Sequence, residues 1–181
     1  MSHGGGHGGG GRTPMAISAT LHCLTGCALG EVAGMVIGTA AGASNGVTLV
    51  LSIALAFVFG YTLTSLPMLR AGMALAVVAP IALASDTLSI ATMEVVDNAV
   101  VLLVPGAMDA GLADVLFWGS LAFALPLAGA VAVPVNRALI ARGKGHAVVH
   151  ERGVMGGPPI PLVGAAAAAA FAFGLVVLLT A

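Results

Sequence analysis

Long apolar segments separated by short polar breaks dominate the pattern of this chain. A helix needs about 20 apolar residues to span a bilayer, because each residue advances about 1.5 Å through about 30 Å of hydrocarbon. Several segments reach this length, and the breaks fall at Gly, Asn, Pro and charged positions. They are Met15–Ala41, Val47–Leu66, Met73–Val104, Val115–Ile140 and Leu162–Ala181. The pattern therefore predicts an all-α, polytopic transmembrane helical bundle with about five spans.

The remaining residues divide the chain into four parts. Residues 1–14 form a Gly/His-rich arm, for which we expect flexibility, and His3 and His7 are potential nitrogen ligands for a metal. Residues 15–142 form a four-span membrane domain. Residues 143–161 form a basic linker that contains His146 and His150, and residues 162–181 form the last transmembrane helix.

The composition supports a membrane location. Hydrophobic residues make up 59% of the 181 residues and charged residues only 7%, whereas about a quarter of an ordinary soluble domain is charged. A soluble fold is therefore excluded, and the lipid bilayer is the expected partner. The formal net charge of −1 gives no reason to expect nucleic acid.

The basic residues predict the orientation, because loops rich in Lys and Arg tend to stay in the cytoplasm. All six fall on one side of the predicted spans, at Arg12, Arg70, Arg137, Arg142, Lys144 and Arg152. The opposite loops, Gly42–Gly46 and Pro105–Asp114, contain no basic residue. We therefore expect a cytoplasmic N-terminus, an external C-terminus and a location in the inner (cytoplasmic) membrane of a bacterium.

Span one carries a ridge of glycines that repeats every four residues. Small residues at this spacing let two helices approach closely, which is a main source of attraction between helices in lipid. The pattern predicts a packing face against another span or another copy of the chain. This glycine ridge consists of Gly26, Gly30, Gly34, Gly38 and Gly42.

A second stripe lies beside the ridge, one position along the helix, and combines sulfur with a carboxylate. It contains Cys23, Cys27, Glu31 and Met35. His22 points about 100° away from Cys23 and would join the stripe only through the flexibility of a helix end. A glutamate in hydrocarbon costs at least about 2.5 kcal/mol, so Glu31 is expected to face the bundle interior and to be paired, protonated or bound to a cation. Thiolate and thioether ligands favour Cu(I), while thiolate with carboxylate or imidazole also suits Zn²⁺. The alternatives are that the cysteines are simply buried as small apolar residues and that Glu31 makes a structural contact between helices.

Span three contains the densest polar cluster at membrane depth. Asp86, Met93 and Asp97 lie within about 20° of one line on the helix, with Glu94 about 80° to one side. Several acids this close cannot all be ionised in a low-dielectric site without a compensating cation, and every Lys and Arg lies at or beyond the cytoplasmic edge of the spans. Protons or a bound cation would supply the missing charge. The alternative is neutral acids that form hydrogen bonds between helices.

Six segments of the chain carry a likeness to a known family, namely Leu21–Met35, Asp86–Ile90, Met93–Asn98, Phe117–Ser120, Pro134–Arg137 and Gly145–His150. Together they resemble one bacterial membrane family, known only as domain of unknown function 4396. The resemblance extends from about His22 to His150 and leaves the arm and the fifth span outside. It implies a shared membrane fold and provides no activity.

These observations lead to one main expectation and two alternatives. The main expectation is a membrane protein that binds or translocates a metal cation, such as copper or another soft or borderline metal, with coupling to protons and assembly into a homo-oligomer or with a partner membrane subunit. The candidate metal ligands are His22, Cys23, Cys27, Glu31, Met35, Asp86, Met93, Glu94 and Asp97. The first alternative is a non-transporting assembly or accessory subunit that packs through the glycine ridge. The second is a membrane enzyme with an acid pair, although the chain contains no Gly-rich phosphate loop, paired-histidine metalloprotease motif or nucleotide fingerprint.

Overall fold

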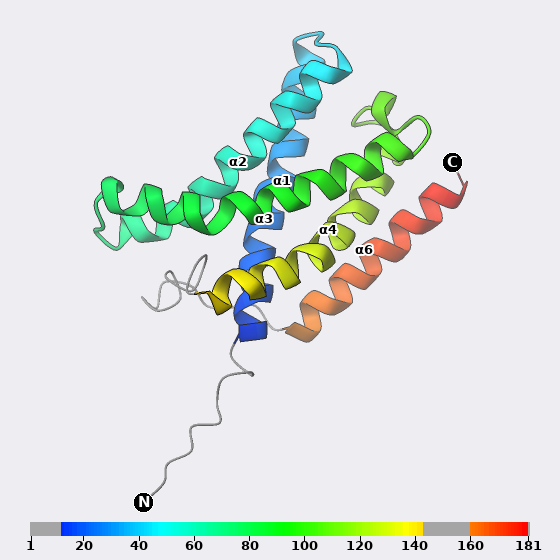
Figure 1. The fold of residues 1–181 in the computed structure, drawn as a ribbon. Helices are drawn as coiled ribbons and strands as arrows, with labels where there is room; N and C mark the ends of the chain where they lie inside the picture. Colours follow the sequence, from blue (N-terminus) through cyan, green and yellow to red (C-terminus); the bar gives the residue numbers. More distant parts are fainter. Residues whose placement is uncertain (1–11, 143–159, 181) are drawn as a thin grey trace, which may run out of the picture.

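The computed structural model describes residues 12–142 and 160–180, and the regular secondary structure in this part of the chain is entirely helical. Figure 1 shows a bundle in which α1 and α2 form one antiparallel pair, α4 and α6 form another, and α3 crosses between them. The elements are α1 (Arg12–Ala40), α2 (Asn45–Arg70), α3 (Leu75–Leu103), the short 3₁₀ helix η1 (Ala107–Asp109), α4 (Val115–Ala141) and α6 (Ile160–Thr180). The predicted all-α helical bundle is confirmed.

Four of these helices are long and apolar enough to cross a membrane. α1 and α3 have 29 residues each, α2 has 26 and α4 has 27. At about 1.5 Å per residue, each of the four exceeds the hydrocarbon thickness of about 30 Å. The protein is therefore a multi-pass membrane protein. The apolar part of α6, Gly164–Thr180, is shorter, so the fifth span stays a prediction.

Some helix boundaries differ from those predicted. α1 begins at Arg12 instead of Met15, because Pro14 lies in the first turn, where the missing N–H of proline costs no hydrogen bond. α2 continues through Pro67 to Arg70, and the chain then turns at Gly72 with φ of +84°. The rest of the arm and residues 143–159, including His146 and His150, lie outside the described residues.

The glycine ridge of α1 packs against α2 of the same chain. A Cβ atom added to Gly30 would collide with the backbone N and Cα of Ala56, and one added to Gly34 would collide with Ser52. The contacts pair each glycine with a small residue of α2: Gly26 with Gly60, Gly30 with Ala56, Gly34 with Ser52, and Gly38 with Thr48. The two backbones are therefore as close as glycine allows, and the partner of the ridge is another span.

The prediction that Gly42 belongs to this ridge is wrong. Gly42 has φ of +63°, and no atom lies within 4 Å of a Cβ added to it. Glycine adopts this left-handed conformation at little cost, which suits it to end a helix. Gly42 therefore ends α1 and lets the chain turn into α2.

A buried hydrogen-bond node joins α1, α3 and α4. The Nδ2 atom of Asn136 donates to Oγ1 of Thr20 at 2.9 Å and to Oγ of Ser89 at 3.0 Å. Asn136 is almost completely buried. The node joins the three helices at one level of the bundle. On α1, this level is closer to the N-terminus than the candidate site described next.

We expect this node to contribute modestly to stability. Asn136→Ala should lower the free energy of unfolding by about 1 kcal/mol, since hydrogen bonds between membrane helices contribute roughly that much. Unfolding in a detergent titration of Asn136→Ala, Ser89→Ala and the double variant would measure the coupling. Fully additive losses would contradict a direct interaction between the two side chains.

Candidate functional site

Three carboxyl groups from two helices meet in the middle of the bundle. Glu31 lies on α1, and Glu94 and Asp97 lie on α3. One carboxylate oxygen from each lies within 4.8 Å of the others. Among the described residues, this carboxyl cluster is the one group of His, Cys, Asp and Glu side chains arranged to hold a metal ion.

The packing of α1 explains why these groups meet. The glycine ridge packs against α2, and the stripe one position along the helix therefore points toward α3. On α3, Asp97 is fully buried and Glu94 is 5% exposed. The stripe of α1 and the acidic line of α3 therefore face the same interior of the bundle. A single ion path lined by both helices would require this arrangement.

The carboxyl cluster lacks hydrogen-bond donors. Neither carboxylate oxygen of Asp97 has a hydrogen-bond partner, and Oε1 of Glu94 has none. Asn98 donates from Nδ2 to the backbone carbonyl of Glu94 at 2.7 Å and to Oε2 of the same residue at 3.3 Å. Buried polar groups are almost always satisfied, so an unpartnered buried carboxyl group is an unusual feature that needs an explanation.

No described basic side chain neutralises these acids. The basic residues of the described chain are exposed and lie at the far ends of the helices, at Arg12, Arg70, Arg137 and Arg142. Arg12 and Arg137 line the same depression, which shows that the start of α1 and the end of α4 are neighbours. Within the described part of the chain, no side chain supplies the positive charge that ionised carboxylates at this site would need.

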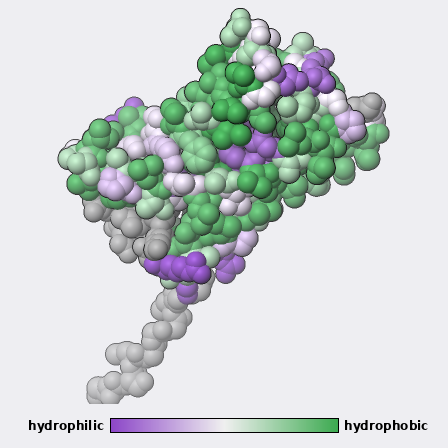
Figure 2. Space-filling view, turned by 45° about the horizontal axis from the view of Figure 1, so that its top comes forward, coloured by the Kyte–Doolittle hydropathy of each residue, from purple (hydrophilic) through white to green (hydrophobic). Residues whose placement is uncertain are grey.

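A cavity of about 270 Å³ leads to the cluster from the opposite end of the bundle. Glu31 and Glu94 lie on its wall, and so do Asn45, the first residue of α2, and Asp109, the last residue of η1. The Nδ2 atom of Asn45 donates to Oδ1 of Asp109 at 2.8 Å, so α2 and η1 are in contact. Figure 2 shows strongly hydrophilic atoms in a recess between apolar surfaces on this face.

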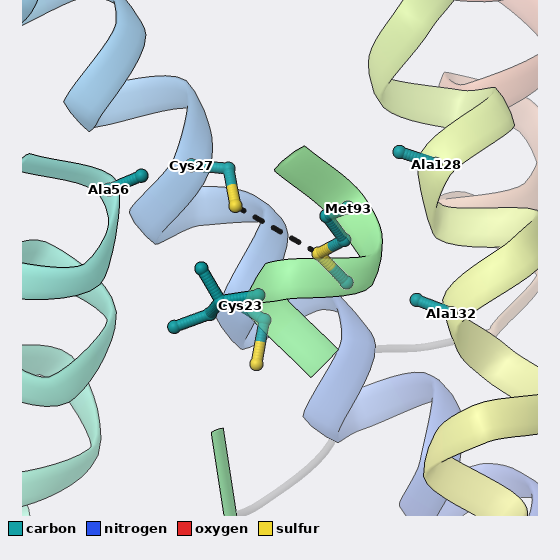
Figure 3. Packing of buried hydrophobic residues seen from close by; sticks show 7 residues of the cluster. Cys23, Cys27, Ala56, Met93, Ala128 and Ala132 are labelled. Atoms are coloured by element: carbon teal, nitrogen blue, oxygen red, sulfur yellow. Dashed lines mark hydrogen bonds between the residues drawn. The ribbon is translucent and has the colours of Figure 1, made fainter. Parts of the chain in front are cut away.

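Sulfur atoms lie next to the carboxyl cluster, one helical turn along α1. Sγ of Cys27 lies 4.0 Å from Sδ of Met93, and Figure 3 shows the two side chains pointing toward each other. Cys23 lies one further turn along, beside Ser89 and within electrostatic range of Asp86. Both cysteines are fully buried.

The other predicted ligands take different positions. Met35 lies on the cavity wall, and Oγ1 of Thr39 lies 3.7 Å from its sulfur. Asp86 is fully buried and accepts a hydrogen bond from Oγ of Ser85 at 2.8 Å. His22 is half-buried and belongs to no described metal-binding group. The nine predicted residues therefore occupy several levels of the bundle.

Three residues that contribute to the site were absent from the predicted set. Asn45 and Asp109 meet at the cavity although 64 positions separate them, and no local pattern signals such a contact. Ser120 of α4 also lies on the cavity wall, and its Oγ is buried without a hydrogen-bond partner. An isolated serine in an apolar helix was the only available signal.

The comparisons with known proteins agree with the resemblance seen in the sequence. The family model described as "Domain of unknown function (DUF4396)" matches residues 14–145. The match covers α1 to α4 and the whole candidate site, whereas α6 lies outside it, and it ends before His146. No curated protein and no solved structure matches the chain. The chain belongs to the family of the domain of unknown function DUF4396.

Proposed function

We propose that the protein binds a small cation inside its membrane domain, at Glu31, Glu94 and Asp97, and exchanges it with one aqueous side through the cavity. The observation that carries this proposal is the fully buried, unpartnered carboxyl group of Asp97 beside two further carboxyl groups. Polar groups of this kind within spans are costly and typically mark ion or proton paths. A bound cation would offset that cost.

The ligand set bears on which cation would bind. Carboxylate oxygens suit hard cations such as Mg²⁺, Ca²⁺ and Mn²⁺, whereas Cu(I) prefers sulfur. The oxygen-only cluster therefore supports a hard cation, with protons in exchange, more than the copper expected from the sequence.

The position of the cavity supports loading from the external side. Asn45 and Asp109 lie at the end opposite to Arg12 and Arg137. If the basic end faces the cytoplasm of a bacterial cell, as the loop charges predict, the cavity opens outward. A route from the cluster to the basic end would have to pass the buried sulfur layer of Cys27 and Met93.

A second candidate is a Cu(I) site at this sulfur layer. Metal–sulfur bonds of about 2.3 Å can join two sulfur atoms up to about 4.6 Å apart. The separation of 4.0 Å between Cys27 Sγ and Met93 Sδ is shorter than this, so a linear two-coordinate Cu(I) ion would require the two sulfur atoms to move about 0.6 Å further apart. Cys27→Ser should abolish copper binding at this site and leave the binding of hard cations to the carboxyl cluster unchanged.

The alternative of an assembly subunit receives less support. The face that would have packed against another subunit is covered by α2. A homo-oligomer or a complex with another membrane subunit would have to use a different surface.

We expect cations to stabilise the wild-type protein against heat and Asp97→Asn to remove this effect. The purified protein would be titrated in detergent with Mg²⁺, Ca²⁺, Mn²⁺ and methylammonium chlorides at constant ionic strength, with Tm as the readout. Asp97→Asn should weaken the binding of the effective cation at least about tenfold, since hydrogen bonds to charged groups contribute about 1.5–3 kcal/mol.

Asp86→Asn is the matched control, because it makes the same substitution at another fully buried aspartate of α3. The control should keep the cation effect. The proposal is wrong if no cation of the panel raises the Tm of the wild-type protein, or if the two variants lose the effect equally.

A further inference from the structure

The cavity beside the carboxyl cluster is much larger than a bare metal ion requires. Its volume of about 270 Å³ approaches the range of about 300–1,000 Å³ that is typical of pockets for small organic ligands. A metal ion held by three carboxylates would occupy only the bottom of such a space. The remaining volume therefore indicates an organic ligand that fills more space than a metal ion.

The walls of the cavity combine apolar and acidic surfaces. Apolar side chains come from all four long helices, at Met35, Leu49, Val101, Phe117, Leu121 and Ala124. The charged lining residues are Glu31, Glu94 and Asp109, and none of the described residues on the wall is basic. A ligand that fits these walls carries positive charge at one end and hydrocarbon at the other.

The polar atoms without hydrogen-bond partners indicate which chemical group the charged end of the ligand carries. Oγ of Ser120 is unpartnered and 3% exposed, and it faces the same cavity from α4. Oε1 of Glu94 and both oxygens of Asp97 are unpartnered as well. Carboxylate oxygens accept hydrogen bonds only, and a hydroxyl can accept them. The complementary ligand is therefore a cation that donates several hydrogen bonds.

From these observations we propose that the cavity binds a small protonated primary amine, with its ammonium group at the carboxyl cluster and Ser120 and its alkyl chain against the apolar wall. The inference rests on the proposed cation binding and specifies the class of cation. A primary ammonium group has three N–H donors, whereas a quaternary ammonium ion of similar size has none. The number of N–H donors on the ligand should therefore affect its affinity for the cavity more than its charge does.

The test compares ammonium ions of equal charge and different numbers of N–H donors, with Mn²⁺ as the metal reference. Binding of propylammonium, methylammonium, tetramethylammonium and Mn²⁺ would be measured by isothermal titration calorimetry on the full chain in detergent, in an amine-free buffer. We expect propylammonium to bind at least about tenfold more tightly than tetramethylammonium, because hydrogen bonds to charged groups are lost in the latter. Ser120→Ala should weaken propylammonium binding severalfold.

A size variant separates the alkyl wall from the charged end. Ala124 is 1% exposed and lies on the cavity wall, so Ala124→Leu should fill the space for the alkyl chain and abolish propylammonium binding while Mn²⁺ binding is kept. Ala130→Leu is the matched control, because Ala130 lies on the exposed surface of the same helix. The control should bind propylammonium like the wild type.

The possible outcomes distinguish the two proposals. Binding of Mn²⁺ without binding of any amine would overturn the amine inference and leave the cation proposal standing. Equal affinity for propylammonium and tetramethylammonium would also overturn the inference. If none of the four cations binds and neither Mg²⁺ nor Ca²⁺ raises the Tm of the wild-type protein, both proposals fail.

Discussion

Replacing Gly30 with alanine is expected to destabilise the protein by about 3 kcal/mol or more, at the upper end of the cost of overpacking. The added methyl group would collide with the backbone N and Cα of Ala56, and a backbone cannot move aside as a flexible side chain can. The α1–α2 pair would have to separate along its length. Close approach is a main attraction between helices in lipid, so the loss should be large.

The control is the same substitution at Gly46. No atom lies within 4 Å of a Cβ added there, and the residue is exposed in the first turn of α2. Alanine in a helix is favoured over glycine by about 0.5–1 kcal/mol, so Gly46→Ala should leave the protein unchanged or slightly more stable. Chemical unfolding in mixed detergent micelles would compare both variants. A Gly30→Ala protein as stable as the wild type would refute the close packing of α1 on α2.

Replacing Asp97 with leucine should have the opposite effect on stability in the absence of cations. Leucine has the same branched outline as aspartate, and it removes a fully buried carboxyl group that has no hydrogen-bond partner. Burying a charged or unsatisfied group costs several kcal/mol, so we expect the variant to gain about 2 kcal/mol. The same variant should lose all stabilisation by cations. A gain in stability with a loss of binding is typical of a functional residue that is poorly satisfied in the fold.

Asp86→Leu is the control for Asp97→Leu, because it makes the same substitution at another buried aspartate of α3. Asp86 is equally buried, but it accepts a hydrogen bond from Ser85. Removing its carboxyl group should therefore destabilise the protein by about 1–3 kcal/mol. Thermal unfolding in amine-free buffer, with and without added cation, would compare both variants with the wild type. If Asp97→Leu is destabilised as much as Asp86→Leu, Asp97 is a structural residue and the cation site loses its main support.

The positions of individual residues show how far the sequence could predict the site. The spacing of Cys23, Cys27, Glu31 and Met35 placed them on one side of α1, and the same reasoning grouped Asp86, Met93 and Asp97 on α3. The structure brings Glu31 to Glu94 and Asp97, and Cys27 to Met93. It separates Asp86 and His22 from the carboxyl cluster, which a stripe on a single helix cannot reveal. It also places the thiols deep in the core, where their accessibility depends on neighbours from α2 and α4.

What the sequence alone determined is the local part of the architecture. Apolar length, proline and glycine positions and the absence of charge predicted the four long helices, because a span in lipid must satisfy its own backbone hydrogen bonds and expose apolar side chains. Only the tertiary structure decided that the glycine ridge faces α2, that Gly42 ends a helix, and that Asn45 and Asp109 meet beside the cavity. In lipid, the outward faces of all helices are similarly apolar, so hydrophobic pattern does not select the partner of each face. That selection comes from the fit of small residues and the pairing of polar groups between helices.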